Sequence, residues 1–225
     1  AVGRAGLLRL GDEGVPVGGP DLLAQGLGDG RPPLEVAGEP FSKVFFTNGG
    51  ADANENAIRL ARGHTGRHKV LSTYRSYHGS TSTAIAATGD PRRWPNDGAA
   101  TDVHHFFGPY LYRSPFWATT EEEEGARALA HLEATIQLEG PSTIAAIVLE
   151  SIPGTAGILV PPGAYLAGVR ELCDKYGIVF VADEVMAGFG RAGEWFAVDH
   201  WGVTPDLKLK PEITAPGGDI YSTLP

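Results

Sequence analysis

Hydrophobic residues stand in short runs along the middle of the chain, and turn residues bound each run. This pattern is typical of strands that are covered on both faces of a sheet. It predicts strands at residues 43–47, 69–74, 144–150 and 178–183. Between the runs, apolar residues recur with helical spacing, which predicts helices at residues 53–62, 80–87, 120–139 and 165–176. Alternating strands and helices favour an α/β fold, a three-layer sandwich with a mostly parallel sheet.

The two ends of the chain lack this pattern. Residues 1–40 contain ten Gly and five Pro but no Lys, His, Phe, Tyr or Trp, a composition typical of a flexible arm. We therefore expect an arm at 1–40 that is disordered or not native to the family described below, a folded core at 41–207, and an irregular tail at 208–225. Within the core, residues 91–115 predict a loop long enough to form part of a site.

Composition narrows the class of protein. Eighteen Lys and Arg against 27 Asp and Glu leave a net charge of −9, which argues against binding nucleic acid through a basic face. The single cysteine, Cys173, can form neither an internal disulfide nor a cysteine-rich metal site. No apolar run approaches the ~20 residues that span a bilayer, and no signal peptide is evident. We expect a cytoplasmic protein without a membrane or metal partner.

Residues with useful chemistry follow the predicted strands, where open parallel sheets bind ligands. Residues 48–51 form a glycine turn that opens a helix and can bind a phosphate, although a tight turn without ligand would have the same sequence. Tyr77 and His78 can stack on a flat ring or can simply pack in the core. Glu150 needs a partner if it is buried, and a structural salt bridge would supply one.

The fourth strand ends in Asp183 and Glu184, and a carboxylate there can hold a metal or a protonated ring nitrogen. The chain lacks the G-x-x-x-x-G-K-[ST] and G-x-G-x-x-G motifs of ATPases and dinucleotide-binding proteins. A calcium loop starting at Asp52 is excluded, because Ala57 and Gly63 occupy its required Gly and Glu positions. A phosphate cradle, a stacking aromatic ring and a buried carboxylate together fit pyridoxal phosphate best.

Residues 43–207 resemble the class III (omega-amino-acid) aminotransferases, which have the pyridoxal-phosphate fold type I. The stretches that carry the resemblance are 46–57, 77–79, 150–157 and 183–193. The resemblance implies the core of the family's large domain, here partial, with pyridoxal 5′-phosphate as its cofactor.

The resemblance also implies a role for individual residues. The N–H groups of Gly50 and Ala51 would bind the cofactor phosphate. Tyr77 would stack on the cofactor ring and Val185 would pack on its other face. Asp183 would act in catalysis by pairing with the ring nitrogen and keeping it protonated.

His78 and Glu150 stand in the shared motifs and are implied to bind the cofactor as well. Met186 occupies a position where the family often has Gln, which bonds the ring hydroxyl, so this contact is absent here. Ser151 replaces the usual Pro, which is a smaller departure.

The family's catalytic lysine follows its Thr-Pro-Asp motif by about six residues, and that position is Glu212 in this chain. Lys210 is the nearest candidate for this role, but Pro211 opposes the strand that would direct it. The family's C-terminal small domain is also missing. We therefore expect an incomplete chain that is not a competent transaminase as written, because the expected lysine is absent, and whose two ends could come from a shifted or joined reading frame.

The resemblance implies transfer of an amino group from an omega-amino acid or amine to a 2-oxo acid such as pyruvate. The alternative is a non-catalytic, degenerate fragment that binds pyridoxal phosphate weakly or not at all. Relatives build their sites at a dimer interface. The aromatic residues of 106–112, with Phe116 and Trp117, form an apolar cluster that a second copy would cover.

Overall fold

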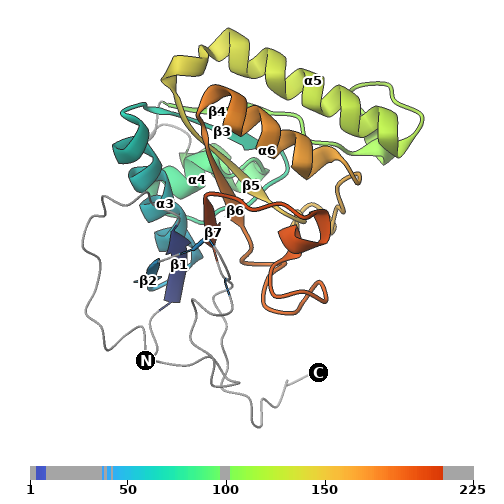
Figure 1. Cartoon of the computed structure of the whole chain (residues 1–225). Coiled ribbons are helices and arrows are strands. Elements are labelled where there is room, and N and C mark those ends of the chain that lie inside the picture. Colours follow the sequence, from blue (N-terminus) through green and yellow to red (C-terminus); the bar gives the residue numbers. More distant parts are fainter. Residues whose placement is uncertain (1–3, 9–36, 38–39, 42, 97–101, 210–225) are drawn as a thin grey trace.

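Seven strands in the described part of the chain form one central sheet in the computed structural model (Figure 1). The structure describes residues 4–8, 37, 40–41, 43–96 and 102–209. The strands are β1 (Arg4–Leu8), β2 (Lys43–Thr47), β3 (Lys69–Thr73), β4 (Val103–Phe106), β5 (Ile144–Glu150), β6 (Val179–Asp183) and β7 (Leu207–Leu209). They lie in the order β2-β1-β7-β6-β5-β3-β4. Strand β1 pairs antiparallel with β2 and with β7, whereas the four other strand pairs are parallel, so this sheet is mostly parallel, as predicted.

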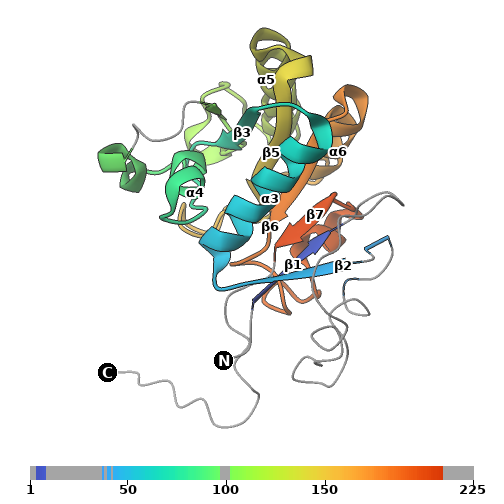
Figure 2. The ribbon, with the colours of Figure 1, turned by 90° about the vertical axis from the view of Figure 1, so that its left-hand side faces the viewer.

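Helices cover both faces of the sheet, which gives the expected three layers. Both views place α3 and α4 on one side of β5 and β6, and α5 and α6 on the other (Figure 1 and Figure 2). These helices are α3 (Gly50–Thr65), α4 (Ser82–Ala87), α5 (Glu121–Glu139) and α6 (Tyr165–Tyr176). Short 3₁₀ helices lie at Pro91–Asn96, Leu111–Arg113, Pro141–Thr143 and Ala197–Trp201.

The unbroken apolar run of β5 is explained by burial on both sides, since every residue of this strand is buried. Successive side chains of a strand point to opposite faces. Ile147 and Leu149 belong to the core with α5 and α6, whereas Ala146 and Val148 belong to the core with α3. The predicted α/β fold is therefore confirmed.

Helix ends agree with the sequence signals. The side chain of Thr120 caps α5 by accepting the N–H of Glu123 at 3.2 Å, and the acidic first turn suits the positive end of the helix dipole. Helix α6 ends at Gly177, which has a φ of +60°, a conformation that favours glycine.

Three strands lie where the sequence indicates none or only irregular structure. Arg4–Leu8 lies in the expected arm, but it forms β1 between β2 and β7. Val103–Phe106 lies in the expected loop, but it forms β4 beside β3. The third, Leu207–Leu209, pairs with β6 and extends into the first residues of the expected tail. Backbone pairing across the sheet makes these strands, and local apolar patterns do not report it.

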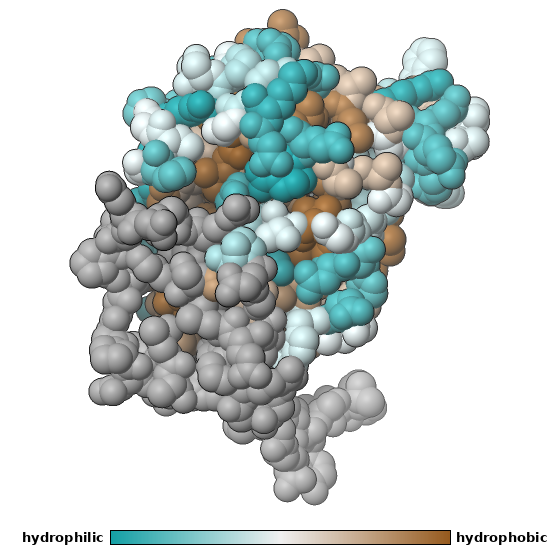
Figure 3. Space-filling model, viewed as in Figure 1, coloured by the Kyte–Doolittle hydropathy of each residue, from teal (hydrophilic) through white to brown (hydrophobic). Residues whose placement is uncertain are grey.

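The coloured part of the surface in Figure 3 is mostly hydrophilic, with smaller hydrophobic areas between the polar residues. Among the helices that the structure describes, none is long and apolar enough to cross a membrane.

Candidate functional site

The carboxylate of Asp183 lies at the centre of the candidate site, at the carboxyl end of β6. Asp183 is only 3% exposed. Its Oδ2 accepts a hydrogen bond from Asn54 Nδ2 at 2.9 Å and lies 2.8 Å from Nδ1 of His78. Its Oδ1 accepts the N–H of Val185 at 3.1 Å. Helix α3, the turn after β3 and the loop after β6 therefore converge on one carboxylate.

Two buried atoms beside this carboxylate have no hydrogen-bond partner within the described residues, namely Nε2 of His78 and Oδ1 of Asn54. Nearly all buried polar atoms in native proteins are hydrogen-bonded. Both atoms belong to side chains whose other polar atom contacts Asp183. Among the described residues the network is therefore incomplete, and it can take a further polar group.

Glu150 ends β5 and stands opposite Asp183 in the parallel ladder. Its Oε1 accepts the N–H of Tyr77 and its Oε2 accepts the N–H of Gly154, both at 2.8 Å. Burial raises the pKa of Glu150 and the Asp183 charge adds to the rise, whereas His78 and the two N–H donors oppose it. The salt bridge that the sequence suggests for Glu150 is not among the ion pairs of the described residues. Backbone donors at the strand ends take its place.

Glu184 is fully buried directly behind the site. Its Oε1 accepts bonds from the Ser151 hydroxyl and from the N–H of Val198 at 3.0 Å, and its Oε2 accepts the N–H of Ala197 at 2.9 Å. Burial raises the pKa of Glu184 against the lowering effect of these donors. The carboxylate ties the far end of loop 185–196 to the end of β6.

The amino terminus of α3 lies against the turn that follows β3. Gly49 is the N-cap, and Gly50 and Ala51 open the helix. Gly79 has a φ of +130°, and a Cβ there would lie 2.5 Å from the Cβ of Ala51, so this close approach requires glycine. The positive end of a helix attracts anions. The structure thus brings the predicted phosphate-binding residues next to the turn that carries Tyr77 and His78.

Tyr77 is held both through its side-chain hydroxyl and through its backbone. Its hydroxyl lies 2.8 Å from Oγ of Ser80, and its backbone N–H bonds to Glu150. The guanidinium carbon of Arg92 lies 3.8 Å from the ring centroid, which is a cation–π contact. Arg92 comes from the 3₁₀ helix Pro91–Asn96 and pairs with Asp90.

Val185 and Met186 lie in the loop after β6. Met186 is 52% exposed, and a Cβ on Gly154 would lie 3.0 Å from its Cγ. The loops that follow β5 and β6 therefore touch at this point. The thioether of Met186 cannot donate a hydrogen bond, so the loss of the ring-hydroxyl contact stays a prediction.

The lysines with described side chains are engaged elsewhere. Lys69 pairs with Glu139 at 2.8 Å and Lys175 with Glu133 at 2.6 Å. Lys208 stands opposite Ala182 in the ladder, so its side chain lies on the other face of the sheet from that of the next residue, Asp183. The predicted Lys210, and Glu212 at the family's lysine position, lie outside the described residues.

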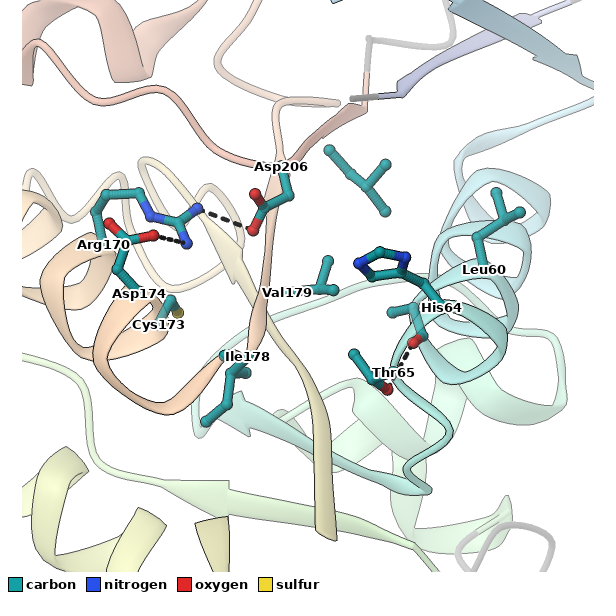
Figure 4. Close-up of a pocket in the computed structure, with 12 residues that line it drawn as sticks. Leu60, His64, Thr65, Arg170, Cys173, Asp174, Ile178, Val179 and Asp206 are labelled. Carbon is teal, nitrogen blue, oxygen red and sulfur yellow. Dashed lines mark hydrogen bonds and ion pairs between the residues drawn. The ribbon is translucent and has the colours of Figure 1, made fainter. Parts of the chain in front are cut away.

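A larger cavity lies far from this site, at the amino ends of the strands (Figure 4). It has a volume of about 230 Å³ between α3 and α6. Arg170 bonds there to Asp206 at 2.9 Å and to Asp174 at 2.8 Å, although its Nε has no described partner. A second cavity of about 40 Å³ includes Glu150 in its lining. Size alone therefore does not identify the candidate site.

Two residues of the site were not found by sequence reasoning. Asn54 stood in the rejected calcium pattern. The sequence did contain a signal for Asn54, because this polar residue lies among the apolar positions of α3 that are buried, such as Ala53 and Ala57. Arg92 gave no signal, because its contact with Tyr77 joins two segments that only the fold brings together.

Residues 23–214 match the family of class III aminotransferases. The chain belongs to this family. The match begins inside the expected arm and ends inside the expected tail. It therefore covers more of the chain than the stretch from 43 to 207 that carries the resemblance.

Several curated aminotransferases with different names are similar in sequence to this chain. An acetylornithine aminotransferase of Corynebacterium efficiens is 39% identical over 191 residues, which are 79% of this chain and 42% of that protein. A vanillin aminotransferase of Capsicum chinense is 35% identical over 79% of this chain and 42% of its own length. The chain thus spans about two fifths of the length of these relatives.

Solved structures show the same fold. A taurine:2-oxoglutarate aminotransferase of Bifidobacterium kashiwanohense, in complex with PLP and glutamate, matches with a TM-score of 0.72 and 49% identity. The match covers 76% of this chain and 40% of that one. An (S)-enantioselective omega-transaminase of Thermomicrobium roseum matches with a TM-score of 0.67 and 41% identity, over 71% of this chain and 37% of that one.

Proposed function

We propose that this chain is the cofactor-binding core of a pyridoxal-phosphate-dependent aminotransferase. The observation that carries the proposal is the buried Asp183 carboxylate, held by His78 and Asn54 at a strand end. A carboxylate can accept about four hydrogen bonds, and that of Asp183 makes three in the described residues. It therefore has capacity for the N–H of a protonated ring, and the unpartnered atoms of His78 and Asn54 also fit a site that a ligand completes.

The residues around Asp183 provide the other contacts that such a cofactor requires. Gly50 and Ala51 at the positive end of α3 would bind its phosphate. Tyr77 and Val185 would contact the two faces of its ring. His78 would hold Asp183 in place, and Glu150 would fix the turn that carries Tyr77. When bound, pyridoxal phosphate supplies an electron sink for the substrate carbon that carries the amino group, and Asp183 would keep the ring nitrogen protonated.

The proposed reaction moves an amino group from an omega-amino acid or amine to a 2-oxo acid such as pyruvate. A base must move a proton at the substrate carbon, and a positioned base typically contributes 10²–10⁴-fold to the rate. Lys210 is our candidate for this base. The relatives, all aminotransferases by name, favour this function over the alternative of a non-catalytic fragment.

Covalent trapping tests this function. The purified chain is mixed with pyridoxal phosphate, reduced with borohydride and digested, and the labelled lysine is located by mass spectrometry. A label on Lys210 that is lost in Lys210→Ala would identify Lys210 as the catalytic lysine despite Pro211. A label spread over Lys69, Lys175 and Lys208 would exclude a defined catalytic lysine. If the cofactor then binds but pyridoxamine phosphate and pyruvate do not react in a single turnover, the non-catalytic alternative is correct.

We also propose that the chain acts as a homodimer in the cytoplasm. Phe106 of the predicted aromatic cluster is only 1% exposed and belongs to the core, and Phe116 packs against that core, so these two rings are not available to a partner. Tyr112 and Trp117 are 81% and 85% exposed, and exposed large apolar side chains favour a partner surface. The cytoplasmic location rests on the single cysteine, since an unpaired thiol suits a reducing compartment.

A further inference from the structure

A second pair of side chains joins the strand ends that carry Glu150 and Asp183. These two residues are the last pair in the ladder between β5 and β6, so Ser151 and Glu184 form the next pair in register. The Ser151 hydroxyl donates to Oε1 of Glu184, and both residues are buried. Successive side chains of a strand point to opposite faces. This hydrogen bond therefore lies behind the strand ends, on the other face from the Asp183 carboxylate.

The three donors to Glu184 come from two different parts of the chain. The N–H groups of Ala197 and Val198 stand at the far end of loop 185–196, and this loop itself begins at Glu184. The Ser151 hydroxyl comes instead from the end of β5. Of these three hydrogen bonds, that of Ser151 is therefore the one that fixes the Glu184 side chain against the neighbouring strand.

The backbone of Glu184 begins a tight turn that carries Val185. The N–H of Gly188 donates to the carbonyl oxygen of Glu184 at 2.8 Å, and a Cβ on Gly188 would lie only 2.9 Å from that oxygen. Within the turn, the N–H of Val185 donates to Oδ1 of Asp183 at 3.1 Å. The turn thus packs directly on Glu184, so a shift of this residue would move Val185 with it.

The residue before Ser151 fixes the opposite side of the site. Glu150 accepts the N–H of Tyr77 at 2.8 Å. Tyr77 and Val185 are the residues proposed to contact the two faces of the cofactor ring. Two consecutive residues of β5 and its end therefore control both contacts, since Glu150 holds Tyr77 directly and Ser151 holds Val185 through Glu184.

We propose that Ser151 is a positioning residue whose hydroxyl sets the gap between Tyr77 and Val185 in which the cofactor ring fits. This inference rests on the proposed function and goes beyond it, because it gives a role to a side chain that would not touch the cofactor. Proline, which the family usually has at this position, has no side-chain hydroxyl. The hydrogen bond to Glu184 is therefore a feature of this chain.

A matched control is present in the same chain. The Ser114 hydroxyl donates to Oε2 of Glu124, and Oε1 of Glu124 accepts the N–H of Tyr110 at 2.6 Å. Glu124 is fully buried, as Glu184 is. This pair links the loop after β4 to α5. Ser114→Ala therefore removes an equivalent serine–glutamate hydrogen bond without changing the proposed gap.

Two ligands test the proposal on the full chain, one with the ring and one without it. Pyridoxamine phosphate carries the ring but lacks the aldehyde that reacts with lysines, and its fluorescence gives its dissociation constant. Inorganic phosphate lacks the ring, and competition gives its dissociation constant. In Ser151→Ala we expect pyridoxamine phosphate to bind about three- to tenfold more weakly, as the loss of one hydrogen bond allows. Phosphate should bind this variant as it binds the unmodified chain.

Two further variants sharpen the comparison. Ser151→Cys keeps a side chain of similar size, but its thiol is a weaker donor, so its affinity for pyridoxamine phosphate should lie between those of the unmodified chain and Ser151→Ala. Ser114→Ala should change neither dissociation constant. If Ser151→Ala does not fold, Ser151→Cys decides alone, and an unchanged ratio of the two constants in that variant overturns the proposal.

The other outcomes separate this proposal from the proposed function. If the unmodified chain does not bind pyridoxamine phosphate, the proposed function is wrong and the role of Ser151 fails with it. If the unmodified chain binds this ligand and Ser151→Ala either binds it equally well or weakens both ligands by the same factor, only the positioning role is wrong. The same holds if Ser114→Ala weakens pyridoxamine phosphate as much as Ser151→Ala does, since loss of stability alone would then explain the effect.

Discussion

The two edges of the sheet hold charged side chains in different ways, since those at the amino edge are partly or largely exposed and those at the carboxyl edge are buried. At the amino edge, Arg170 lies between Asp174 and Asp206, and Asp206 also accepts the N–H of Phe180 at 2.7 Å. Each charge there has a partner of opposite sign. At the carboxyl edge, Glu150 and Glu184 depend largely on backbone N–H groups, and Asp183 depends on an amide and an imidazole.

This difference identifies the functional edge better than volume does. The larger cavity lies at the amino edge, where the ion pairs are already formed (Figure 4). The carboxyl edge has an excess of negative charge and unpartnered atoms on His78 and Asn54. Buried charge without a counter-charge is costly, so this edge is the one that a positively charged ligand group would stabilise.

The largest expected effect comes from removing the central charge. Asp183→Asn should weaken pyridoxal phosphate binding about 10- to 100-fold, since a hydrogen bond to a charged group is lost, and it should lower any transamination by a larger factor. Absorbance titration with the cofactor measures the binding. Asp206→Asn, at the opposite edge, should cost about 2 kcal/mol of stability and leave the affinity unchanged. If Asp183→Asn binds the cofactor as tightly as the unmodified chain, the carboxyl edge is not the cofactor-binding edge.

The next effect concerns the loop behind the site. Glu184→Gln turns one acceptor oxygen toward Ala197 or Val198 into an N–H₂ group, which leaves a buried backbone N–H without a partner. We expect a loss of about 1–3 kcal/mol in the free energy of unfolding, measured in urea. Glu133→Gln, which removes an exposed partner of Lys175, should change the midpoint little. If the two variants behave alike, the three bonds to Glu184 contribute no stability.

The smallest effect is a change in pH dependence. Burial raises the pKa of Glu150 above its ordinary 4.5, so its favourable contribution is present below pH 4.5 and is lost as the pH rises through the native value. Glu150→Gln should therefore gain stability relative to the unmodified chain as the pH rises above 4.5.

Glu139 provides the opposite case, because its hydrogen bond to Lys69 lowers its pKa. Its contribution is present above pH 4.5 and is lost as the pH falls through the native value, so Glu139→Gln should lose relative stability above pH 4.5. Urea unfolding at several pH values measures both slopes. Parallel slopes in the two variants would contradict the different environments of these carboxyl groups.

The sequence by itself determined the layers and much of the site. The apolar runs of β3, β5 and β6 report burial on both faces, and this property is local and periodic. Parallel strands bring their carboxyl ends to one edge, so the residues after each run could be predicted to meet. Gly50, Tyr77, Glu150 and Asp183 all lie at that edge in the structure.

Tertiary structure decided which atoms meet at that edge. Asn54 bonds Asp183 across 129 positions of the chain, and the spacing of apolar residues does not specify such a pair. The short strands β1 and β4 depend on backbone pairing with distant strands, which local composition does not reveal. Glu150 received backbone N–H donors in place of a salt bridge, and Arg92 came to lie on Tyr77. These contacts form only once the folded sheet brings its turns together, so side-chain patterns along the chain predict the edge but not its hydrogen bonds.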